Sequence, residues 1–242
     1  MMLYERRRMK LPPINLWGID AKLHRLEGGH RNTAFRTRGC GQDFVFKSTR
    51  RSPEAMMWLL SVHDLARQSG FIVPQLIESE NGHLVENGWT CEPFIHGDPV
   101  SIGDLAAIEP QISMFHELST GVPQRPGFLS SLALLEAMAG GDVDFGAMPP
   151  KLVALCRDAW SSVSSGKISI VHGDLNPANL LRCESGRITL LDWDECRQDL
   201  IIFDIGQLSN VDATTKRALL AWEVACSWVI EPDHALKAAQ HL

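Results

Sequence analysis

The chain has 242 residues, of which 45% are apolar and 21% are charged, and its formal net charge at pH 7 is −6. A chain of this size can bury a full hydrophobic core, and its composition excludes a disordered or repetitive protein. The acidic balance gives a polyanion such as DNA no general electrostatic attraction, so we expect no nucleic-acid partner.

The first 50 residues predict short strands. Apolar and polar residues alternate over 22–27 and over 33–38, and residues 43–48 place β-formers ahead of Lys47. Glycines separate the three segments, which indicates a turn at each gap. The pattern favours a meander of strands at the start of the chain.

A helix and a second group of extended segments follow. Ser-Pro-Glu at 52–54 supplies an N-cap, a first-turn proline and a first-turn carboxylate, and the helix should end at Gln68. Between residues 74 and 97, two Asn-Gly pairs separate three extended runs, and Asn-Gly between apolar stretches is the strongest short hairpin signal. We therefore predict a five-stranded antiparallel sheet with one helix in the N-terminal part of the chain.

The remainder of the chain is predicted to be mainly helical. Helical periodicity dominates residues 104–118, 150–164, 213–230 and 234–242, and short strands are expected at 167–172 and 187–192. A sheet-rich part followed by a helix-rich part is typical of the α+β class. We predict an N-terminal lobe at 1–92, a hinge at 93–97 and a C-terminal lobe at 98–242.

No membrane segment and no cysteine-based metal site are predicted. The longest apolar run near the C-terminus covers residues 218–230 and contains Glu223, whereas a membrane-spanning helix needs about 20 apolar residues. The N-terminus lacks the apolar region of a secretory signal. The six cysteines have neither a CxxC pair nor metal-ligand spacing with histidine. We expect a cytoplasmic protein with reduced thiols, without a membrane or protein partner.

One loop gathers side chains suited to chemistry. In HGDLNPANLL, residues 172–181, Asp174 and Asn179 lie on a proline-containing loop directly after a predicted strand. Asp192 ends a second apolar strand, which a hairpin would bring back beside that loop. Carboxylate and amide oxygens are ligands for hard cations, and each residue alone would be an ordinary turn residue. Together they predict magnesium-assisted phosphoryl transfer to a hydroxyl that faces Asp174.

These residues resemble the protein-kinase signature and, in detail, the aminoglycoside phosphotransferase and choline kinase superfamily. In that superfamily the catalytic loop reads H-G-D-x-x-x-x-N, and a later metal-binding Asp is followed by Trp or Phe and an acidic residue. The matching text here is HGDLNPAN and LLDWDE, and FDIGQL at 203–208 matches the next feature. The segment 28–47 resembles the glycine-containing loop and lysine strand. The resemblance implies a bilobal, protein-kinase-like fold.

The resemblance also implies a role for each matching residue. Asp174 would orient and deprotonate the acceptor hydroxyl, while Asn179 and Asp192 would hold Mg²⁺ ions that bridge the phosphates of ATP or GTP. His172 and Asp204 would brace the loop. The nucleotide-binding residues would be Lys47 at the α and β phosphates, Gly28, Gly29 and Asn32 in the loop that covers them, Glu54 as the partner of Lys47, and Glu92 and Phe94 in the hinge segment at the adenine edge.

Some of these roles have simpler alternatives. Glu54 lies in the first turn of its predicted helix, where it would equally complement the helix dipole. Lys47 would by itself be an ordinary solvated lysine at a strand end. The glycine pair at 28–29 would by itself be an ordinary hairpin turn.

A small molecule is the expected acceptor. Asp204 lies only 12 positions after Asp192, and a protein kinase needs a longer segment there to hold a peptide. The acidic residues expected near the mouth of the site are Asp142, Asp144, Asp194, Glu195 and Asp199. They would attract a cationic acceptor, either aminoglycoside-like or choline-like, unless they are ordinary solvated loops. Trp160 and Trp193 could stack on such a cation, or could be core residues.

Two other functions stay open. A nucleotide-binding pseudokinase with a regulatory or scaffold role is suggested by the early position of Glu54 and by the short chain after Asp204. A protein kinase is disfavoured by the short segment before Asp204. Phosphoryl transfer to a small molecule distinguishes the enzyme from both alternatives.

Overall fold

The computed structural model describes residues 11–27, 31–39 and 41–242, and over these residues the chain forms two compact units. The first unit runs up to Arg50 and includes Leu76–Phe94; the second comprises Arg51–Gln75 and Ile95–Leu242. The chain thus leaves the first unit, returns to it once, and passes finally to the second after Phe94. The helix expected after Ser52 belongs to the second unit, and the predicted lobe limits stay predictions.

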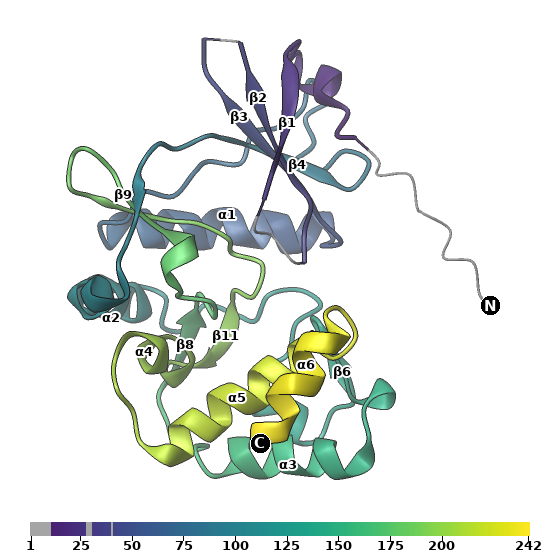
Figure 1. The fold of residues 1–242 in the computed structure, drawn as a ribbon, viewed down its shortest axis with the longest axis vertical. Coiled ribbons are helices and arrows are strands. Elements are labelled where there is room, and N and C mark those ends of the chain that lie inside the picture. The colour runs from purple at the N-terminus through teal and green to yellow at the C-terminus, as the bar shows by residue number, and fades with distance from the viewer. Residues whose placement is uncertain (1–10, 28–30, 40) are drawn as a thin grey trace. The chain divides into compact units, whose positions relative to one another are not determined.

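The first unit contains an antiparallel sheet (Figure 1). Its strands are β1 (Lys22–Leu26), β2 (Ala34–Arg38), β3 (Phe44–Ser48) and β4 (Trp89–Pro93), hydrogen-bonded in that order. A 3₁₀ helix, η1 (Ile14–Trp17), precedes them. The α+β class and the N-terminal antiparallel sheet are therefore confirmed.

The described residues of this sheet form four strands, so the expected number of five was wrong. Of the two extended segments expected before β4, residues 83–86 form only an isolated bridge, Glu86 to Trp89. Residues 76–80 make one backbone bond to β4, from the Ile77 N–H to the Cys91 carbonyl at 2.8 Å. The next contact turns elsewhere, because the Glu80 N–H donates to the Leu16 carbonyl at 2.8 Å. A continuous ladder cannot form when successive backbone groups bond to different neighbours.

The two faces of the sheet differ in character because side chains alternate along each strand. Phe35 faces Phe46, and Phe46 faces Cys91, on the face that packs with Trp17. The rings of Trp17 and Phe46 meet edge to face at 5.3 Å. Lys47 lies one residue beyond Phe46 and is therefore on the opposite, more polar face.

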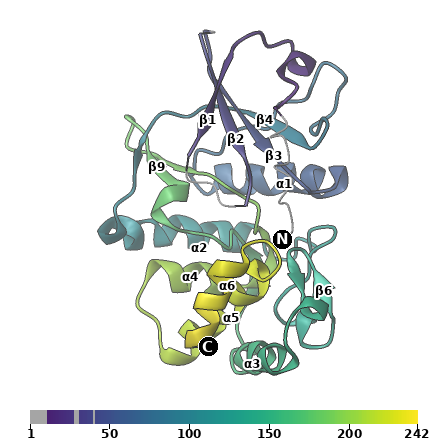
Figure 2. The same ribbon diagram turned by 45° about the vertical axis from the view of Figure 1, so that its right-hand side comes forward.

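Helices make up most of the second unit. They are α1 (Pro53–Gln68), α2 (Glu109–Leu118), α3 (Pro150–Ser161), α4 (Ile202–Leu208), α5 (Ala213–Ser227) and α6 (Pro232–Ala238), with η2 (Ile102–Ile108) before α2 and η6 (Ala239–His241) after α6. Figures 1 and 2 show α5 and α6 side by side. Ser52 caps α1 by accepting from the Ala55 N–H at 3.2 Å, as its sequence predicts. No helix in the described part of the chain is long and apolar enough to cross a membrane.

Short strands in the second unit carry the loop that contains the motif. One pair joins β8 (Ile168–Val171) to β11 (Arg197–Leu200), and one sheet joins β10 (Ile188–Leu190), β9 (Leu180–Arg182) and β5 (Asp98–Pro99). A further pair joins β6 (Ala139–Gly140) to β7 (Val143–Asp144), and single 3₁₀ turns are η3 (Ala133–Leu135), η4 (Phe145–Ala147) and η5 (Pro177–Asn179). The expected strands β8 and β10 are confirmed; β9 and β11 were not foreseen.

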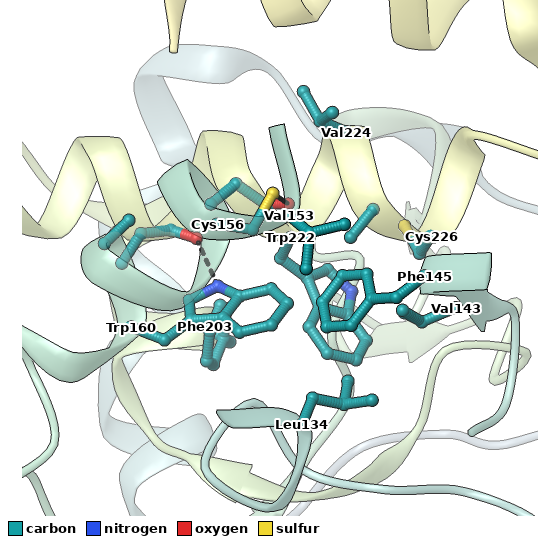
Figure 3. Close-up of a cluster of buried hydrophobic side chains, with 14 of the residues drawn as sticks. Leu134, Val143, Phe145, Val153, Cys156, Trp160, Phe203, Trp222, Val224 and Cys226 are labelled. Atoms are coloured by element: carbon teal, nitrogen blue, oxygen red, sulfur yellow. Dashed lines mark hydrogen bonds between the residues drawn. The ribbon is translucent and has the colours of Figure 1, made fainter. Parts of the chain in front are cut away.

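The core of the second unit is built around aromatic side chains (Figure 3). Trp160 is fully buried, stacks on Phe145 at 6.0 Å and donates its indole N–H to the Ala218 carbonyl at 3.2 Å. Trp222 lies 5.9 Å from Trp160 and 5.6 Å from Phe203. Trp160 is therefore a core residue. The alternative that it stacks on a cationic acceptor was wrong, because its side chain is fully buried.

We expect Phe145→Ala to lower the free energy of unfolding by about 3–5 kcal/mol, because it leaves a cavity beside Trp160. Urea unfolding followed by tryptophan fluorescence measures this change. Met138→Ala is the control, since the Met138 side chain is 54% exposed and its removal leaves no buried cavity. Equal stability of the two variants would show that this aromatic cluster does not hold the unit together.

Candidate active site

The motif loop begins where β8 ends, and its first turn requires glycine. Gly173 has a φ of +87°, and a Cβ at this position would lie 2.8 Å from Nη1 of Arg197 and 3.0 Å from the Glu195 carbonyl oxygen. No larger residue fits such a backbone next to a buried guanidinium. The glycine therefore lets the loop pass directly over the segment that follows Asp192.

Asp174 is held by two amide side chains of the same loop. Its Oδ1 accepts from Nδ2 of Asn176 at 2.7 Å, and its Oδ2 accepts from Nδ2 of Asn179 at 2.8 Å. The Asn179 amide also donates to the backbone carbonyl of Asp174 at 2.9 Å. Asn176 was not among the predicted site residues, although its place two residues after Asp174 is visible in the motif. The loop thus fixes the carboxylate in one orientation.

The β9–β10 hairpin brings Asp192 to the same loop. Leu180 faces Leu190 in the hairpin, and the next pair continues it, because the Leu191 N–H donates to the Asn179 carbonyl at 2.9 Å. Asp192 follows with a φ of +56°, a left-handed backbone that is uncommon outside glycine but tolerated by aspartate. The hairpin therefore joins the backbone of Asn179 to Leu191, the residue before Asp192.

The donor set at these two positions fits Mg²⁺. The Asn179 amide nitrogen is used by Asp174, so the oxygen is the side-chain atom that can bind a cation. Among the described residues, no group of three or more His, Cys, Asp or Glu side chains is placed to hold a metal. Mg²⁺ needs no such cage, because it binds through one or two protein oxygens together with substrate phosphates and water.

Asp204, at the start of α4, stabilises the loop by hydrogen bonds to its backbone. Its fully buried carboxylate accepts from the backbone N–H groups of His172, at 2.9 Å, and Gly173, at 2.8 Å. It also accepts from Nε2 of His116 on α2 at 2.9 Å. Burial by itself would raise the pKa of Asp204, but the hydrogen bonds, led by that of His116, outweigh it and lower the pKa below its usual value. Asp204 therefore holds the loop as a carboxylate.

His172 connects the loop to the end of β10. Its Nε2 donates to the Leu191 carbonyl at 2.8 Å, and its Nδ1 accepts from the Asp174 N–H at 3.3 Å. Both bonds are satisfied when the proton is on Nε2. His172 thus ties the backbone of Asp174 to the residue before Asp192, which supports the bracing role expected for it. His116 was missed, because nothing local in the sequence marks a histidine 88 residues from its partner.

Two arginines hold the turn that follows Asp192. Arg125 is 1% exposed, and its Nη1 donates to the carbonyls of Trp193, Asp194 and Cys196 at 3.0, 3.1 and 3.3 Å. Arg51 adds a bond to the Asp194 carbonyl at 3.3 Å. Neither arginine was predicted, since both come from loops far from the motif. Their donors leave this turn little freedom to move.

Of the acidic residues expected at the mouth of the site, Asp199 is fully buried, so that expectation was wrong for this residue. The place of the other four at the mouth stays a prediction, and each has a partner within the protein. Asp142 forms two hydrogen bonds with Arg51, and Asp194 lies 4.0 Å from the same guanidinium. The other three acidic residues also have partners: Asp199 contacts Arg197 and Ser131, Glu195 contacts the Trp222 indole, and Asp144 accepts from the Gly146 N–H. Trp193 is also buried, 4.8 Å from the His172 ring, and so is a core residue.

The first unit carries the other predicted residues. The Lys47 Nζ lies 3.3 Å from Oε1 of Glu92, and the Phe94 ring lies 3.6 Å from the Arg36 guanidinium carbon. Asn32 is half-buried just before β2, while Gly28 and Gly29 lie outside the described residues. The nucleotide-binding roles of these residues stay predictions.

Glu54, in the first turn of α1, is exposed and belongs to the second unit. Hydrogen bonds from its own backbone N–H and from the Ser52 side chain lower its pKa. This environment suits the alternative role at the helix N-terminus. Its pairing with Lys47 stays a prediction.

Comparisons with known proteins identify the family of the chain. Residues 22–225 match the family model described as the phosphotransferase enzyme family. No curated protein sequence matches the chain. Choline kinase LicA from Streptococcus pneumoniae is similar in structure, with a TM-score of 0.63, 12% identity and coverage of 92% of each chain.

Two further solved structures are similar. An aminoglycoside phosphotransferase from Alicyclobacillus acidocaldarius has a TM-score of 0.55 and 16% identity, over 99% of this chain and 93% of that one. A thermostable mutant of the aminoglycoside phosphotransferase APH(4)-Ia, in a ternary complex with AMP-PNP and hygromycin B, has a TM-score of 0.61 and 14% identity, over 94% and 93%. At these identities the likeness shows a shared fold, of the α+β, protein-kinase-like kind. Since the family model covers most of the sequence, the chain belongs to the phosphotransferase enzyme family.

Proposed function

We propose that this phosphotransferase transfers the γ-phosphoryl group of ATP or GTP to a hydroxyl group of a small molecule in a Mg²⁺-dependent reaction. The observation that carries the proposal is the orientation of Asp174, whose two carboxylate oxygens accept from Asn176 and Asn179. The Asn179 carbonyl in turn accepts from the N–H of Leu191, the residue before Asp192. An oriented carboxylate next to oxygen ligands for a cation is what phosphoryl transfer to a hydroxyl requires.

Asp174 would serve as the base in this reaction. The acceptor oxygen forms a bond to the γ-phosphorus, the bond from that phosphorus to the bridging oxygen breaks, and the hydroxyl proton passes to the Asp174 carboxylate. Asn179 and Asp192 would hold Mg²⁺, which neutralises charge on the nucleotide phosphates. The bonds from Asp204 and His172 keep the loop backbone in place throughout.

The first unit would supply the nucleotide contacts. Lys47 would pair with the α and β phosphates, and Gly28, Gly29 and Asn32 would lie in the loop that covers them. Glu92 and Phe94 would meet the adenine edge through their backbone. The AMP-PNP in the related ternary complex is consistent with an adenine nucleotide as co-substrate.

The acceptor in this proposal is a hydroxyl-bearing small molecule. Support comes from the short segment between Asp192 and Asp204 and from relatives that include a choline kinase and an enzyme bound to hygromycin B. The charge of the acceptor is left to experiment, because the carboxylates that suggested a cation are engaged within the protein. We also propose a cytoplasmic location, where nucleoside triphosphates are available and cysteines stay reduced.

A screen of acceptors tests the proposal. Release of ADP or GDP is measured with Mg²⁺ against aminoglycosides, choline, ethanolamine, homoserine, thiamine and sugar-like alcohols, and ³¹P NMR identifies the phosphate ester. We expect one class of alcohol to be phosphorylated, with no product when EDTA removes the metal. Nucleotide binding without transfer to any compound would favour a pseudokinase, and label on protein would favour a protein kinase; either result contradicts the proposal.

A further inference from the structure

An ion pair on the polar face of the first unit's sheet gives Lys47 a partner that the motif did not predict. The ammonium of Lys47 on β3 lies 3.3 Å from Oε1 of Glu92 on β4. In the antiparallel register Lys47 faces Thr90 and Val45 faces Glu92. The two charged residues are therefore diagonal neighbours on one face, a spacing that long side chains bridge readily.

The sheet fixes the backbone on both sides of this pair. On the opposite face, Phe46 and Cys91 are fully buried in the apolar cluster with Trp17. A slip of one residue between β3 and β4 would move Lys47 into that cluster, so the register is strongly specified. The pair thus rests on a rigid support.

The pair is also partly shielded from solvent. The side chains of Lys47 and Glu92 are 25% and 13% exposed. Partial burial strengthens the attraction between opposite charges relative to a surface pair. Glu92 can therefore restrict the long, flexible stem of Lys47 to a small set of conformations.

Glu54, the partner that the family resemblance implied, makes local hydrogen bonds at the start of α1. Its carboxylate accepts hydrogen bonds from its own backbone N–H and from Ser52, and both lower its pKa. The Ser52 side chain in turn accepts from the Ala55 N–H, which completes the cap of α1. The local bonds of Glu54 are those of a residue that stabilises a helix N-terminus.

We infer that Glu92 is the positioning residue that orients Lys47 toward the nucleotide phosphates. In this role the Glu92 carboxylate contacts the lysine and not the nucleotide. It restricts Lys47 before the nucleotide binds, so that less conformational entropy is lost on binding. The inference rests on the proposed function, because it assumes that Lys47 binds the phosphates. It adds a side-chain role to a residue that was expected to act through its backbone.

A double-mutant cycle tests the inference. The proteins are wild type, Glu92→Gln, Lys47→Ala and the double variant, with Glu78→Gln as the control, since Glu78 is an exposed glutamate of the same unit. The KM for the nucleotide and kcat are measured at saturating acceptor, and calorimetry measures binding of MgATP. We expect Glu92→Gln to raise the KM and the Kd for MgATP roughly tenfold, with a smaller effect on kcat.

The cycle separates positioning from a merely structural role. If Glu92 acts through Lys47, the double variant loses no more MgATP affinity than Lys47→Ala alone. Additive losses, or MgATP affinity in Glu92→Gln equal to that of wild type, would overturn the inference. A larger effect from Glu54→Gln than from Glu92→Gln would assign the partner role to Glu54 and overturn it equally.

Failure of the proposed function gives a different result. If the proposed function is wrong, the wild-type protein transfers no phosphate in the acceptor screen. If only the inference is wrong, the wild-type protein still turns over. Calorimetry still reads the coupling between Lys47 and Glu92 when turnover is absent. A wild-type protein that binds neither MgATP nor MgGTP would overturn both.

Discussion

Asp174→Asn is expected to lower kcat by about 10²–10⁴-fold, the range by which a positioned general base accelerates proton transfer. The substitution keeps the size of the side chain but removes the negative charge. It also replaces one hydrogen-bond acceptor with a donor, so either Asn176 or Asn179 loses its partner at this side chain. Steady-state assays with the acceptor found in the screen measure the effect.

The control for this variant is Asp233→Asn, because Asp233 is an exposed aspartate in the first turn of α6. We expect its kcat to match that of wild type. Binding of MgATP to Asp174→Asn should persist, since Asp174 is assigned to the acceptor and not to the nucleotide. Full turnover in Asp174→Asn would refute the role of Asp174 as base.

Asp204→Asn is expected to lower the free energy of unfolding at pH 7 by about 3 kcal/mol, the upper range for a buried hydrogen-bonding group that loses its partner. The wild-type carboxylate accepts from two backbone N–H groups and from His116. An amide in its place offers one oxygen, so buried donors lose their acceptor. Urea unfolding measures the stability, and we expect activity to fall as well because the loop carrying Asp174 loses its brace.

The stability lost in Asp204→Asn should depend on pH in a defined direction. The pKa of Asp204 in the folded protein is lowered, so its contribution is complete above the ordinary aspartate pKa of about 3.9 and is lost as the pH falls through the folded value. The difference between wild type and variant should therefore be constant near neutral pH and narrow in acid. Asp158→Asn is the control, since its pair with Arg217 is exposed and should contribute less than about 1 kcal/mol. A constant difference down to strongly acidic pH would contradict a lowered pKa.

Elements whose signals lie within a few neighbouring residues were predicted well. The cap, the proline and the periodicity after Ser52 place α1 at the observed residues, Pro53–Gln68. Alternation and turn residues place β1, β2 and β3. The spacing of Asp174, Asn179 and Asp192 predicted one shared loop and hairpin, because strand–turn–strand geometry over a few residues leaves few alternatives.

Features that depend on distant partners were not predicted. The number of strands was wrong because the Glu80 N–H bonds to Leu16, a choice that no local pattern records. The burial of Asp199 and the pairing of Asp142 with Arg51, 91 residues away, were not predicted for the same reason. The hydrogen bond from His116 to Asp204 and the ion pair of Glu92 with Lys47 were not predicted either. Charge in a sequence indicates the presence of ionic groups, whereas only the fold decides which of them pair.

The most direct test of the central claim is the binding of Mn²⁺, as a paramagnetic substitute for Mg²⁺, in the presence of nucleotide, followed by electron paramagnetic resonance. The variants Asp192→Ala and Asn179→Ala are compared with wild type and with the control Asp233→Ala. If Asn179 and Asp192 are the ligands that join metal and nucleotide, each variant loses more than about tenfold in Mn²⁺ affinity while the control does not. Mn²⁺ bound equally well by all four proteins would contradict the account.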